Sequence, residues 1–567
     1  MAKVINYDLK TKEFDLLNQE TPLIEYPNKQ FERESYYSLN GKWDVRISNI
    51  DSLEGEFKEK ILVPYCLESK NSLVCKALKK GEFIIYHRTF SLDKDFIKDK
   101  TFINFIGVDQ EFDLYINGDK YGHYIPLCLP TKIDISKSIK EVNEIYVVVK
   151  DDLDLNIPYG KQVRKQKGMW YTSVSGIYYP VYLESVNEGY IESVKIDTSL
   201  DSVTFDVVSS DLDIDVKITF LDKIVYQGKL ENKKEIKLND IHLWNVDTPN
   251  LYNVEFKNKS DKVKSYFALR KIEMREGFVY LNNKKIFLNG VLDQGYYPEG
   301  IYTVSDYNSY LYDIEVLKDL GINCIRKHIK VELDYFYYLC DKVGMLVLQD
   351  FVNNGKYSFI RDTALPTVLY GISLNDKRLH KNKIERENFK KHGEGLIKYL
   401  HNHPCIIGYT IFNEAWGQFE ADKNYEYFKS LEPNLLFDAT SGWFKQNKSD
   451  FESHHIYFKD INKRIKNITK PVFISEFGGY SYKIDEHSFN LSNTYGYRLL
   501  HSQEDYERDL IDLYKNQILS NKHRLVGCIF TQTSDVEDET NGFMTYDRKV
   551  IKVSSEEFKE LMREISK

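Results

Sequence analysis

Ile286-Phe287-Leu288-Asn289-Gly290-Val291 opens the stretch of sequence that decides the fold of this chain. A helix-like segment with apolar residues three and four apart follows over 310–320, and then the short strand candidate Asn323-Cys324-Ile325-Arg326. A second helix-like segment around 335–343 precedes Met345-Leu346-Val347-Leu348-Gln349-Asp350. Short apolar strands that alternate with amphipathic helices indicate parallel β/α units.

The same alternation continues toward the end of the chain. Five more strand candidates lie at 408–414, 435–441, 453–458, 471–477 and 527–535. Eight strands with helical or long connections over about 285 residues fit a (β/α)8 TIM barrel. An open doubly wound sheet is the alternative, but it needs a glycine-rich phosphate-binding turn after its first strand, which this sequence lacks. We therefore predict a barrel.

A different pattern precedes the barrel. From about residue 36 to 185, short strands with period-two alternation, such as Tyr86-His87-Arg88-Thr89-Phe90, are separated by turns such as Asn117-Gly118. This pattern is typical of an antiparallel β-sandwich. Residues 186–270 continue it in a shorter unit whose length suits an immunoglobulin-like sandwich. The predicted domains are 1–185, 186–272 and 273–567.

The composition excludes several classes of function. The 567 residues carry 78 basic and 86 acidic side chains, a net charge of −8 without a concentrated basic block, so nucleic acid is not an expected partner. No apolar run approaches the roughly 18 residues of a membrane span, and the first residues lack the apolar segment of a signal peptide. The seven cysteines form no Cys-x-x-Cys pair, which argues against a zinc site and a disulfide framework. We expect a cytoplasmic protein that does not bind membranes.

Two glutamates directly follow apolar strands of the predicted barrel. Ile411-Phe412-Asn413 leads into Glu414, and Ile474-Ser475 leads into Glu476. Catalytic groups of such barrels lie at the carboxyl ends of the strands. Two carboxyl groups across one barrel mouth can flank a glycosidic bond, because one can protonate the leaving oxygen while the other attacks the anomeric carbon. The alternative is that both glutamates only pair with neighbouring arginines.

Further motifs occur in order along nearly the whole chain. They are Leu39-Asn40-Gly41-Lys42-Trp43, Trp170-Tyr171-Thr172-Ser173-Val174-Ser175-Gly176-Ile177, Leu243-Trp244-Asn245-Val246-Asp247-Thr248-Pro249, His403-Pro404 before Asn413-Glu414, and Ile474-Ser475-Glu476-Phe477-Gly478-Gly479. Taken together, these motifs resemble glycoside hydrolase family 2, the family of β-galactosidases, β-glucuronidases and β-mannosidases. The resemblance implies an N-terminal jelly-roll sandwich of the sugar-binding type, an immunoglobulin-like sandwich and a catalytic TIM barrel.

The resemblance also implies roles for matching residues. Glu414 would be the general acid/base, and Glu476 would be the nucleophile, which must stay ionised. Asn413 would hydrogen-bond the sugar 2-hydroxyl, an interaction that strengthens in the transition state, unless it only caps the next helix. Arg326 matches the family position that steadies the nucleophile carboxylate.

A His-x-Tyr sequence of the family also has a counterpart. His455 and Tyr457 match it, and the tyrosine would orient the nucleophile. The neighbouring His454 is the alternative for the histidine of this motif. His328 would contact substrate or form a structural ion pair. The remaining candidates follow other predicted strands: Asp293 and Asp350, which would bind substrate hydroxyls or hold loops, and Trp416 and Trp443, which would stack on a sugar face or pack in loops.

An acidic run follows the eighth predicted strand. It contains Asp535, Glu537, Asp538 and Glu539. Some relatives bind magnesium or sodium near the active site, but charge runs are usually solvated and this run matches no metal-binding loop. We therefore predict no metal and no organic cofactor.

The combined prediction is a retaining exo-β-glycosidase that acts on a carbohydrate β-glycoside through a covalent glycosyl-enzyme. β-Galactoside is the expected substrate, although the sequence ends soon after the barrel, without the extra domains of the large β-galactosidases. β-Glucuronidase is the alternative, but the Asn-x-Lys motif by which family glucuronidases grip the substrate carboxylate is absent between 476 and 567. A non-catalytic carbohydrate-binding protein and an oxidoreductase are alternatives of other classes; the first has no need of the carboxylate pair, and the second lacks a dinucleotide fingerprint. Multidomain enzymes of this kind often associate, so by analogy a homo-oligomer is an open expectation.

Overall fold

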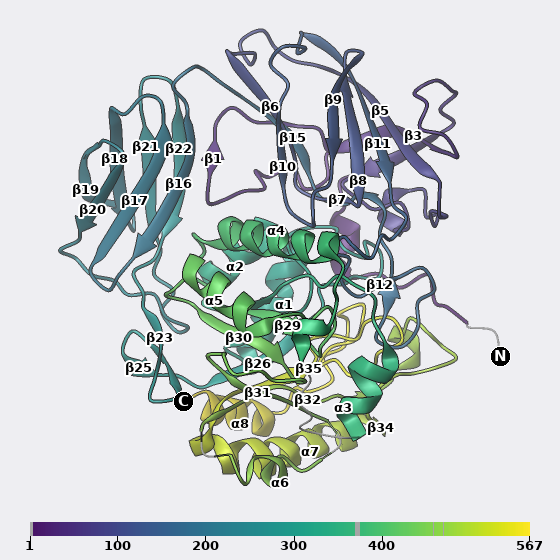
Figure 1. Ribbon diagram of the computed structural model, residues 1–567, viewed down its shortest axis with the longest axis vertical. Coiled ribbons are helices and arrows are strands. Elements are labelled where there is room, and N and C mark those ends of the chain that lie inside the picture. The colour runs from purple at the N-terminus through teal and green to yellow at the C-terminus, as the bar shows by residue number, and fades with distance from the viewer. Residues whose placement is uncertain (1–3, 369–374, 458, 469) are drawn as a thin grey trace.

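The computed structural model describes residues 4–368, 375–457, 459–468 and 470–567. Two β-sandwiches lie side by side over a barrel surrounded by helices (Figure 1). Each of the three parts has a core of buried apolar side chains, and the largest core belongs to the barrel. The three-domain architecture predicted from the sequence is confirmed.

The first sandwich consists of a six-stranded and a four-stranded antiparallel sheet. Trp43 and Tyr86 are fully buried between them, in an edge-to-face contact. Asn117 and Gly118 have φ of 51° and 90°, the left-handed pair that a tight hairpin turn requires. In sheet order the strands are β4 (Glu59–Val63), β3 (Gly41–Ser48), β5 (Phe83–Ser91), β11 (Val142–Lys150), β8 (Glu111–Ile116) and β9 (Asp119–Tyr124), and then β10 (Thr131–Asp134), β6 (Lys100–Phe105), β15 (Val181–Val186) and β2 (Tyr37–Ser38).

The second sandwich has a five-stranded and a three-stranded sheet. Its strands are β1 (Glu32–Arg33), β22 (Lys262–Phe267), β21 (Tyr252–Lys257), β18 (Ile214–Phe220) and β19 (Lys223–Leu230), facing β16 (Ile191–Thr198), β17 (Ser202–Ser209) and β20 (Lys233–Lys237). The first of these comes from the N-terminal segment: Glu32 pairs with Lys264 and Arg33 with Val263. The start of the chain therefore belongs to the second sandwich as well as the first.

Eight parallel strands form the barrel sheet. In sheet order they are β30 (Leu436–Ser441), β29 (Ile406–Asn413), β28 (Leu346–Asp350), β27 (Cys324–Lys327), β26 (Leu288–Asp293), β35 (Leu525–Thr531), β32 (Val472–Gly478) and β31 (Glu452–Ile456). The two end strands, β30 and β31, are consecutive in the chain, and Ser441 Oγ lies 2.9 Å from His455 Nε2 across the seam between them. This side-chain contact brings the two edges of the sheet together.

All eight strands predicted for the barrel are present. Phe458, the last residue of one predicted strand, lies outside the described residues. The longer surrounding helices carry apolar side chains at helical spacing and bury one face, as Tyr310, Ile314 and Leu317 do in the helix Asn308–Asp319. The helices are α1 (Asn308–Asp319), α2 (Asp334–Val343), α3 (Leu365–Val368), α4 (Lys383–Leu400), α5 (Ala421–Leu431), α6 (Ile461–Ile465), α7 (Gln503–Leu513) and α8 (Glu556–Ser566). Within the described ranges, none of the helices is long and apolar enough to cross a bilayer.

A buried arginine joins the N-terminal segment to both sandwiches. Arg33 Nη1 lies 3.1 Å from Glu184 Oε1 in β15, and its Nε lies 3.0 Å from Asp261 Oδ2 beside β22. All three side chains are almost completely buried. Removal of the cation would leave two carboxylates without their counter-charge in a low-dielectric environment.

We expect Arg33→Met to lower the free energy of unfolding by about 3–5 kcal/mol, because it breaks a buried ion pair on one side only. Lys42→Met is the matched control, since the Lys42–Glu20 pair is exposed and should contribute at most about 1 kcal/mol. Urea denaturation of both variants measures the difference. Equal effects of the two substitutions would contradict this view of the junction.

Candidate active site

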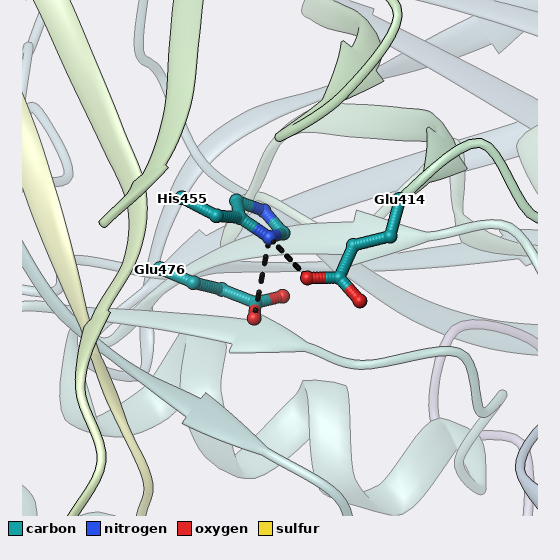
Figure 2. Close-up of side chains that lie close together, drawn as sticks. All are labelled: Glu414, His455 and Glu476. Carbon is teal, nitrogen blue, oxygen red and sulfur yellow. Dashed lines mark hydrogen bonds and ion pairs between the residues drawn. The ribbon is translucent and has the colours of Figure 1, made fainter. Parts of the chain in front are cut away.

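The carboxyl ends of the barrel strands bring two glutamates and a histidine together. Glu414 follows β29, His455 lies in β31 and Glu476 lies in β32. One carboxylate oxygen of each glutamate and one ring nitrogen of His455 all lie within 4.8 Å of one another. Figure 2 shows the two carboxyl groups facing each other, with the imidazole beside both.

A backbone turn at the end of β29 places Glu414 at the barrel mouth. Glu414 and Ala415 have φ of 51° and 62°, the left-handed region that non-glycine residues rarely occupy. The Glu414 N–H donates to the Ser441 carbonyl at 2.9 Å, which holds this turn against β30. Its side chain remains 18% exposed, whereas that of Glu476 is only 6% exposed. Strained backbone of this kind is often found where a side chain must be aimed into a functional site.

Glu476 is surrounded by groups that favour its charged form. Arg326 Nη1 donates to Oε1 at 3.1 Å, and the Tyr457 hydroxyl donates to Oε2. Burial by itself would raise the pKa of this carboxyl group, but the charges of His455 and Arg326 outweigh burial and lower the pKa to about 2. Glu476 is therefore ionised at neutral pH, as a nucleophile must be.

Arg326 is completely buried, and its hydrogen bonds connect four strands. Its Nε and Nη2 donate to the two oxygens of Asp350 at 2.9 and 3.0 Å. Nη2 also donates to Asn413 Oδ1 at 2.8 Å, and Nη1 donates to the Ser475 carbonyl at 3.0 Å. Asp350 is thus a partner of Arg326 at the base of the site. Because Asn413 Oδ1 accepts the hydrogen bond from Arg326, the Asn413 Nδ2 group remains able to donate to another partner.

His455, rather than His454, faces the glutamate pair. Its Nδ1 lies 2.8 Å from Glu414 Oε1 and 3.5 Å from Glu476 Oε2. His454 instead lies 2.6 Å from Lys445 Nζ on the other face of the strand. Pairing between β31 and β32 shifts register between the two histidines, a bulge that the sequence pattern does not reveal.

His328 has one satisfied and one unsatisfied ring nitrogen. Nδ1 lies 2.7 Å from Asp350 Oδ2, whereas the buried Nε2 has no hydrogen-bond partner among the described residues. Burial and the nearby charge of Lys161 lower the pKa of His328 to about 4. The neutral ring therefore donates from Nδ1 to Asp350 and presents Nε2 as an acceptor.

The two tryptophans lie in different surroundings. Trp443 packs beside the His455 ring at 5.5 Å, and its buried indole N–H has no partner among the described residues. Trp416 is 3% exposed, donates to the Gly355 carbonyl and packs edge-on against Trp170 of the first sandwich at 5.0 Å. Trp416 therefore packs between the first sandwich and the barrel, and very little of its ring is exposed.

Asp293 belongs to a separate charged cluster. Its Oδ2 accepts from Lys327 Nζ at 2.7 Å, and Lys327 also pairs with Glu332. Lys327 follows Arg326 in the strand, so its side chain points to the opposite face of the sheet. Within the described parts of the chain, Asp293 makes no hydrogen bond or ion pair with either glutamate of the site, and this arrangement favours a structural role.

The acidic run after β35 is buried, so the expectation of solvated charges is wrong. Asp535, Glu537, Asp538 and Glu539 are each at most 4% exposed. Asp535 pairs with Lys552, whereas the other three accept from the first sandwich: Thr172 N–H to Glu537 at 3.1 Å, Gly168 N–H to Asp538 at 3.1 Å, and the Tyr171 hydroxyl to Glu539. Glu537, Asp538 and Glu539 therefore bind the first sandwich to the barrel at its mouth.

Sequence reasoning missed three residues of the site. Ser441 and Thr531 end β30 and β35; Ser441 Oγ contacts His455, and Thr531 Oγ1 lies 3.0 Å from the Tyr457 hydroxyl. The strand-end rule applied to the glutamates would have found both. Lys161, whose charge acts on Glu476 and His328, lies in the first sandwich. No local pattern marks it.

Comparisons with known proteins agree with the three-part architecture. Models described as the TIM barrel domain, the sugar binding domain and a further domain of glycosyl hydrolases family 2 match residues 272–566, 70–186 and 186–270. A putative beta-glucuronidase of Formosa agariphila is 25% identical over 69% of this chain and 37% of its own length. A beta-galactosidase of Thermoanaerobacterium thermosulfurigenes is 26% identical over 55% of this chain and 50% of its own length. The chain thus spans half or less of the length of these curated relatives.

Solved structures show the same fold. A beta-glucuronidase of an uncultured Clostridium superposes with a TM-score of 0.74 and 17% identity over 95% of this chain and 99% of its own. A beta-D-glucuronidase of Dictyoglomus thermophilum gives a TM-score of 0.75 and 16% identity over 96% and 98%. The resemblance seen in the sequence motifs is confirmed.

Gly442 lets His455 approach the backbone after β30. Its φ is +89°, and a Cβ at this position would lie 2.7 Å from the His455 ring. We expect Gly442→Ala to displace the ring and to destabilise the fold by about 1 kcal/mol for the left-handed backbone plus about 1–3 kcal/mol for overpacking.

Gly118→Ala is the control for this substitution, because Gly118 has φ of +90° and no atom within 4 Å of the added Cβ. Gly118→Ala should lower the free energy of unfolding only by the amount due to the left-handed backbone, because the added Cβ meets no other atom. Chemical denaturation measures both values. If the two glycine variants lose the same stability, the close approach of His455 does not require a glycine.

Proposed function

Because the chain belongs to glycoside hydrolase family 2, we propose that it is a retaining exo-β-glycosidase that works by double displacement through a covalent glycosyl-enzyme. The observation that carries this proposal is the spacing of Glu414 and Glu476, whose nearest oxygens fall within 4.8 Å. Carboxyl groups of retaining enzymes lie about 5–5.5 Å apart, whereas inverting pairs are separated by about 6.5–9.5 Å to admit a water molecule. The short spacing therefore favours direct attack by a carboxylate.

Glu476 has the surroundings of the nucleophile. Attack on the anomeric carbon requires a carboxylate that is ionised before substrate binds, and Arg326 and Tyr457 both donate to this group. Their hydrogen bonds also fix the orientation of the attacking oxygen. When the covalent intermediate is hydrolysed, the negative charge returns to the Glu476 carboxylate, which the same two donors stabilise.

Glu414 has the position of the acid/base. It lies at the mouth, where a leaving group would depart, and it faces Glu476 across the site (Figure 2). In the first step it would give a proton to the glycosidic oxygen, and in the second it would take one from the attacking water. The contact of its Oε1 with His455 Nδ1 leaves Oε2 to face the substrate.

Other residues are suited to hold the sugar. Asn413 Nδ2 is oriented by the Arg326–Oδ1 hydrogen bond and would donate to the 2-hydroxyl, an interaction that contributes most in the oxocarbenium-like transition state. His328 Nε2 and Trp443 Nε1 supply an acceptor and a donor that protein groups leave unsatisfied. A protein that only bound carbohydrate would not need an ionised carboxylate opposite a second carboxyl group.

The sugar is a separate question. β-Galactoside is the substrate predicted from the sequence, and the Thermoanaerobacterium relative carries the name beta-galactosidase. β-Glucuronide is the second candidate, since the Formosa relative is named a putative beta-glucuronidase and the Clostridium structure a beta-glucuronidase. The positive charge of Lys161 near the pair favours the second candidate. A cytoplasmic location and homo-oligomers stay predictions.

The two proposed roles are distinguished by replacing each glutamate and adding azide. Glu476→Ala should lower hydrolysis of every β-glycoside by several powers of ten, because no covalent intermediate forms; each power of ten is about 1.4 kcal/mol of barrier. Glu414→Ala should keep glycosylation by dinitrophenyl glycosides, whose leaving group needs little protonation. Azide should then restore its turnover and give a β-glycosyl azide.

The anomer formed is the decisive readout, obtained by NMR of the product. With Glu476→Ala, azide can attack only directly and gives the α-azide. An α-azide from Glu414→Ala would mean that the roles are exchanged. Full activity of both variants would place the catalytic pair elsewhere. Asp213→Ala, at an exposed carboxylate of the second sandwich, is the control and should leave turnover unchanged.

Tyr457→Phe should move the acidic limb of the kcat/KM profile to higher pH, by up to about one unit. The hydroxyl donates to the ionised form of Glu476, so its loss raises the pKa of that carboxyl group from about 2, and the nucleophile is protonated at a higher pH. Tyr425→Phe is the control, because Tyr425 donates to Asp450 outside the site. An unmoved limb with lower kcat would mean that Tyr457 only orients the carboxylate.

A further inference from the structure

A segment of the first sandwich crosses the mouth of the barrel. The Tyr159 and Gly160 N–H groups donate to the Asn353 carbonyl, just beyond β28, at 3.1 and 3.2 Å. At the other end of the segment, Thr172 and Gly168 donate to the acids that follow β35. The short strand β12 (Gln162–Val163) lies between these attachments, where the sandwich meets the barrel (Figure 1). Residues 159–172 are therefore held against both sides of the mouth.

Lys161 lies within this segment, directly at the rim. The preceding residue, Gly160, is so close to the loop after β27 that an added Cβ would lie 2.9 Å from the Ile329 carbonyl oxygen. The Lys161 carbonyl accepts from the Tyr171 N–H at 2.9 Å, which fixes the backbone on its other side. The side chain is half-buried, although the neighbouring Arg164 and Lys165 are exposed.

The lysine charge reaches groups on three sides of the mouth. It opposes the effect of burial on the pKa of Glu476 in β32 and of Glu539 after β35, and it adds to burial in lowering the pKa of His328 after β27. With its backbone held at the rim and its side chain half-buried, Lys161 lies close enough to the mouth for its charge to act on all three groups.

Lys161 has no counter-ion of its own. Among the described residues, none of the carboxylates lies within 4.0 Å of its Nζ in an ion pair, while Lys327 and Lys552, both buried nearby in the barrel, each have one. Two more polar atoms of the site, His328 Nε2 and Trp443 Nε1, are buried without partners in this part of the chain. Buried polar groups without a protein partner are expected where a ligand supplies the missing hydrogen bonds.

We propose that Lys161 is a specificity-determining residue that binds a carboxylate on the sugar, so that the preferred substrates are β-glycosides of acidic sugars (uronides). The proposal rests on the glycosidase function proposed above and names its substrate class. The cation comes from the first sandwich, so it differs in origin from a lysine of the barrel loops. Lys161 would take the place of the Asn-x-Lys lysine, since no Asn-x-Lys sequence occurs between 476 and 567.

The charge balance of the reaction supports an acidic sugar. The transition state carries positive charge at the anomeric centre, and an uncompensated ammonium group nearby disfavours it. Formation of the glycosyl-enzyme also consumes the negative charge of Glu476, which leaves Lys161 and Arg326 with less compensation. A substrate carboxylate paired with Lys161 removes the first penalty and reduces the second. A neutral sugar does neither.

Lys161→Gln tests the proposal, with Lys161→Arg as the charge-conserving variant and Lys165→Gln as the control on an exposed lysine of the same segment. Nitrophenyl β-glucuronide, β-galacturonide, β-galactoside and β-glucoside are the substrates. We expect the unmodified protein to prefer the two uronides. Lys161→Gln should lose roughly 10²- to 10³-fold in kcat/KM on them and less than about fivefold on the neutral glycosides.

Additional readouts separate recognition from a structural role. Lys161→Gln should weaken inhibition by free glucuronate but leave inhibition by galactose and the thermal unfolding midpoint unchanged. Lys161→Arg should recover part of the uronide activity, and Lys165→Gln should match the unmodified protein.

Three outcomes would overturn the inference. Equal losses on uronides and neutral glycosides would mean that Lys161 acts on Glu476 and not on the substrate, and a preference of the unmodified protein for neutral glycosides would exclude an acidic sugar. Unchanged uronide activity of Lys161→Gln would remove the lysine from the site. In each of these cases the proposed glycosidase function survives; it fails only if the unmodified protein hydrolyses none of the four β-glycosides.

Discussion

The buried guanidinium group of Arg326 is the interaction on which the geometry of the site depends. Its five N–H donors make five hydrogen bonds: two to Asp350, and one each to Glu476, the Ser475 carbonyl and Asn413. A buried cation is tolerated only when every donor is satisfied and a counter-charge is present. Arg326 has both, so the ends of β27, β28, β29 and β32 are held in one register, and the proposed nucleophile Glu476 and the proposed 2-hydroxyl ligand Asn413 are positioned together.

The two glutamates differ because their surroundings differ. Glu476 lies in the strand itself, buried beside Arg326 and Tyr457, and these donors compensate for the loss of hydration. Glu414 lies one residue beyond the end of its strand, on a left-handed turn at the edge of the mouth. His455 contacts both carboxyl groups and is itself oriented by Ser441 across the seam of the barrel. Closure of the sheet between β30 and β31 is therefore linked directly to the positions of the pair.

The first sandwich completes the site as well as covering it. Three acids that follow β35 accept from backbone or hydroxyl groups of residues 168–172, and Trp170 packs against Trp416 beyond β29. Burial of these acids would be costly without such donors. The contact between sandwich and barrel therefore depends on polar groups from both domains, and it fixes the backbone of Lys161 at the rim of the barrel.

Local patterns in the sequence determined the strands, the helices and the two glutamates. Strand and helix periodicity, the Asn117-Gly118 turn and a carboxylate placed directly after an apolar strand are properties of neighbouring residues, so they can be recognised without knowledge of the fold. Only the tertiary structure decided which side chains meet. Alternation along β31 turns His455 rather than His454 to the glutamates, and a β-bulge in the pairing with β32 sets His455 opposite Glu476. The alternation of β27 sends Lys327 with Asp293 away from Arg326, and Asp350 already pairs with Arg326. Lys161 and the buried acids after β35 depend on contacts between domains far apart in the chain, and burial and electrostatic environment at such contacts arise only when those segments are brought together.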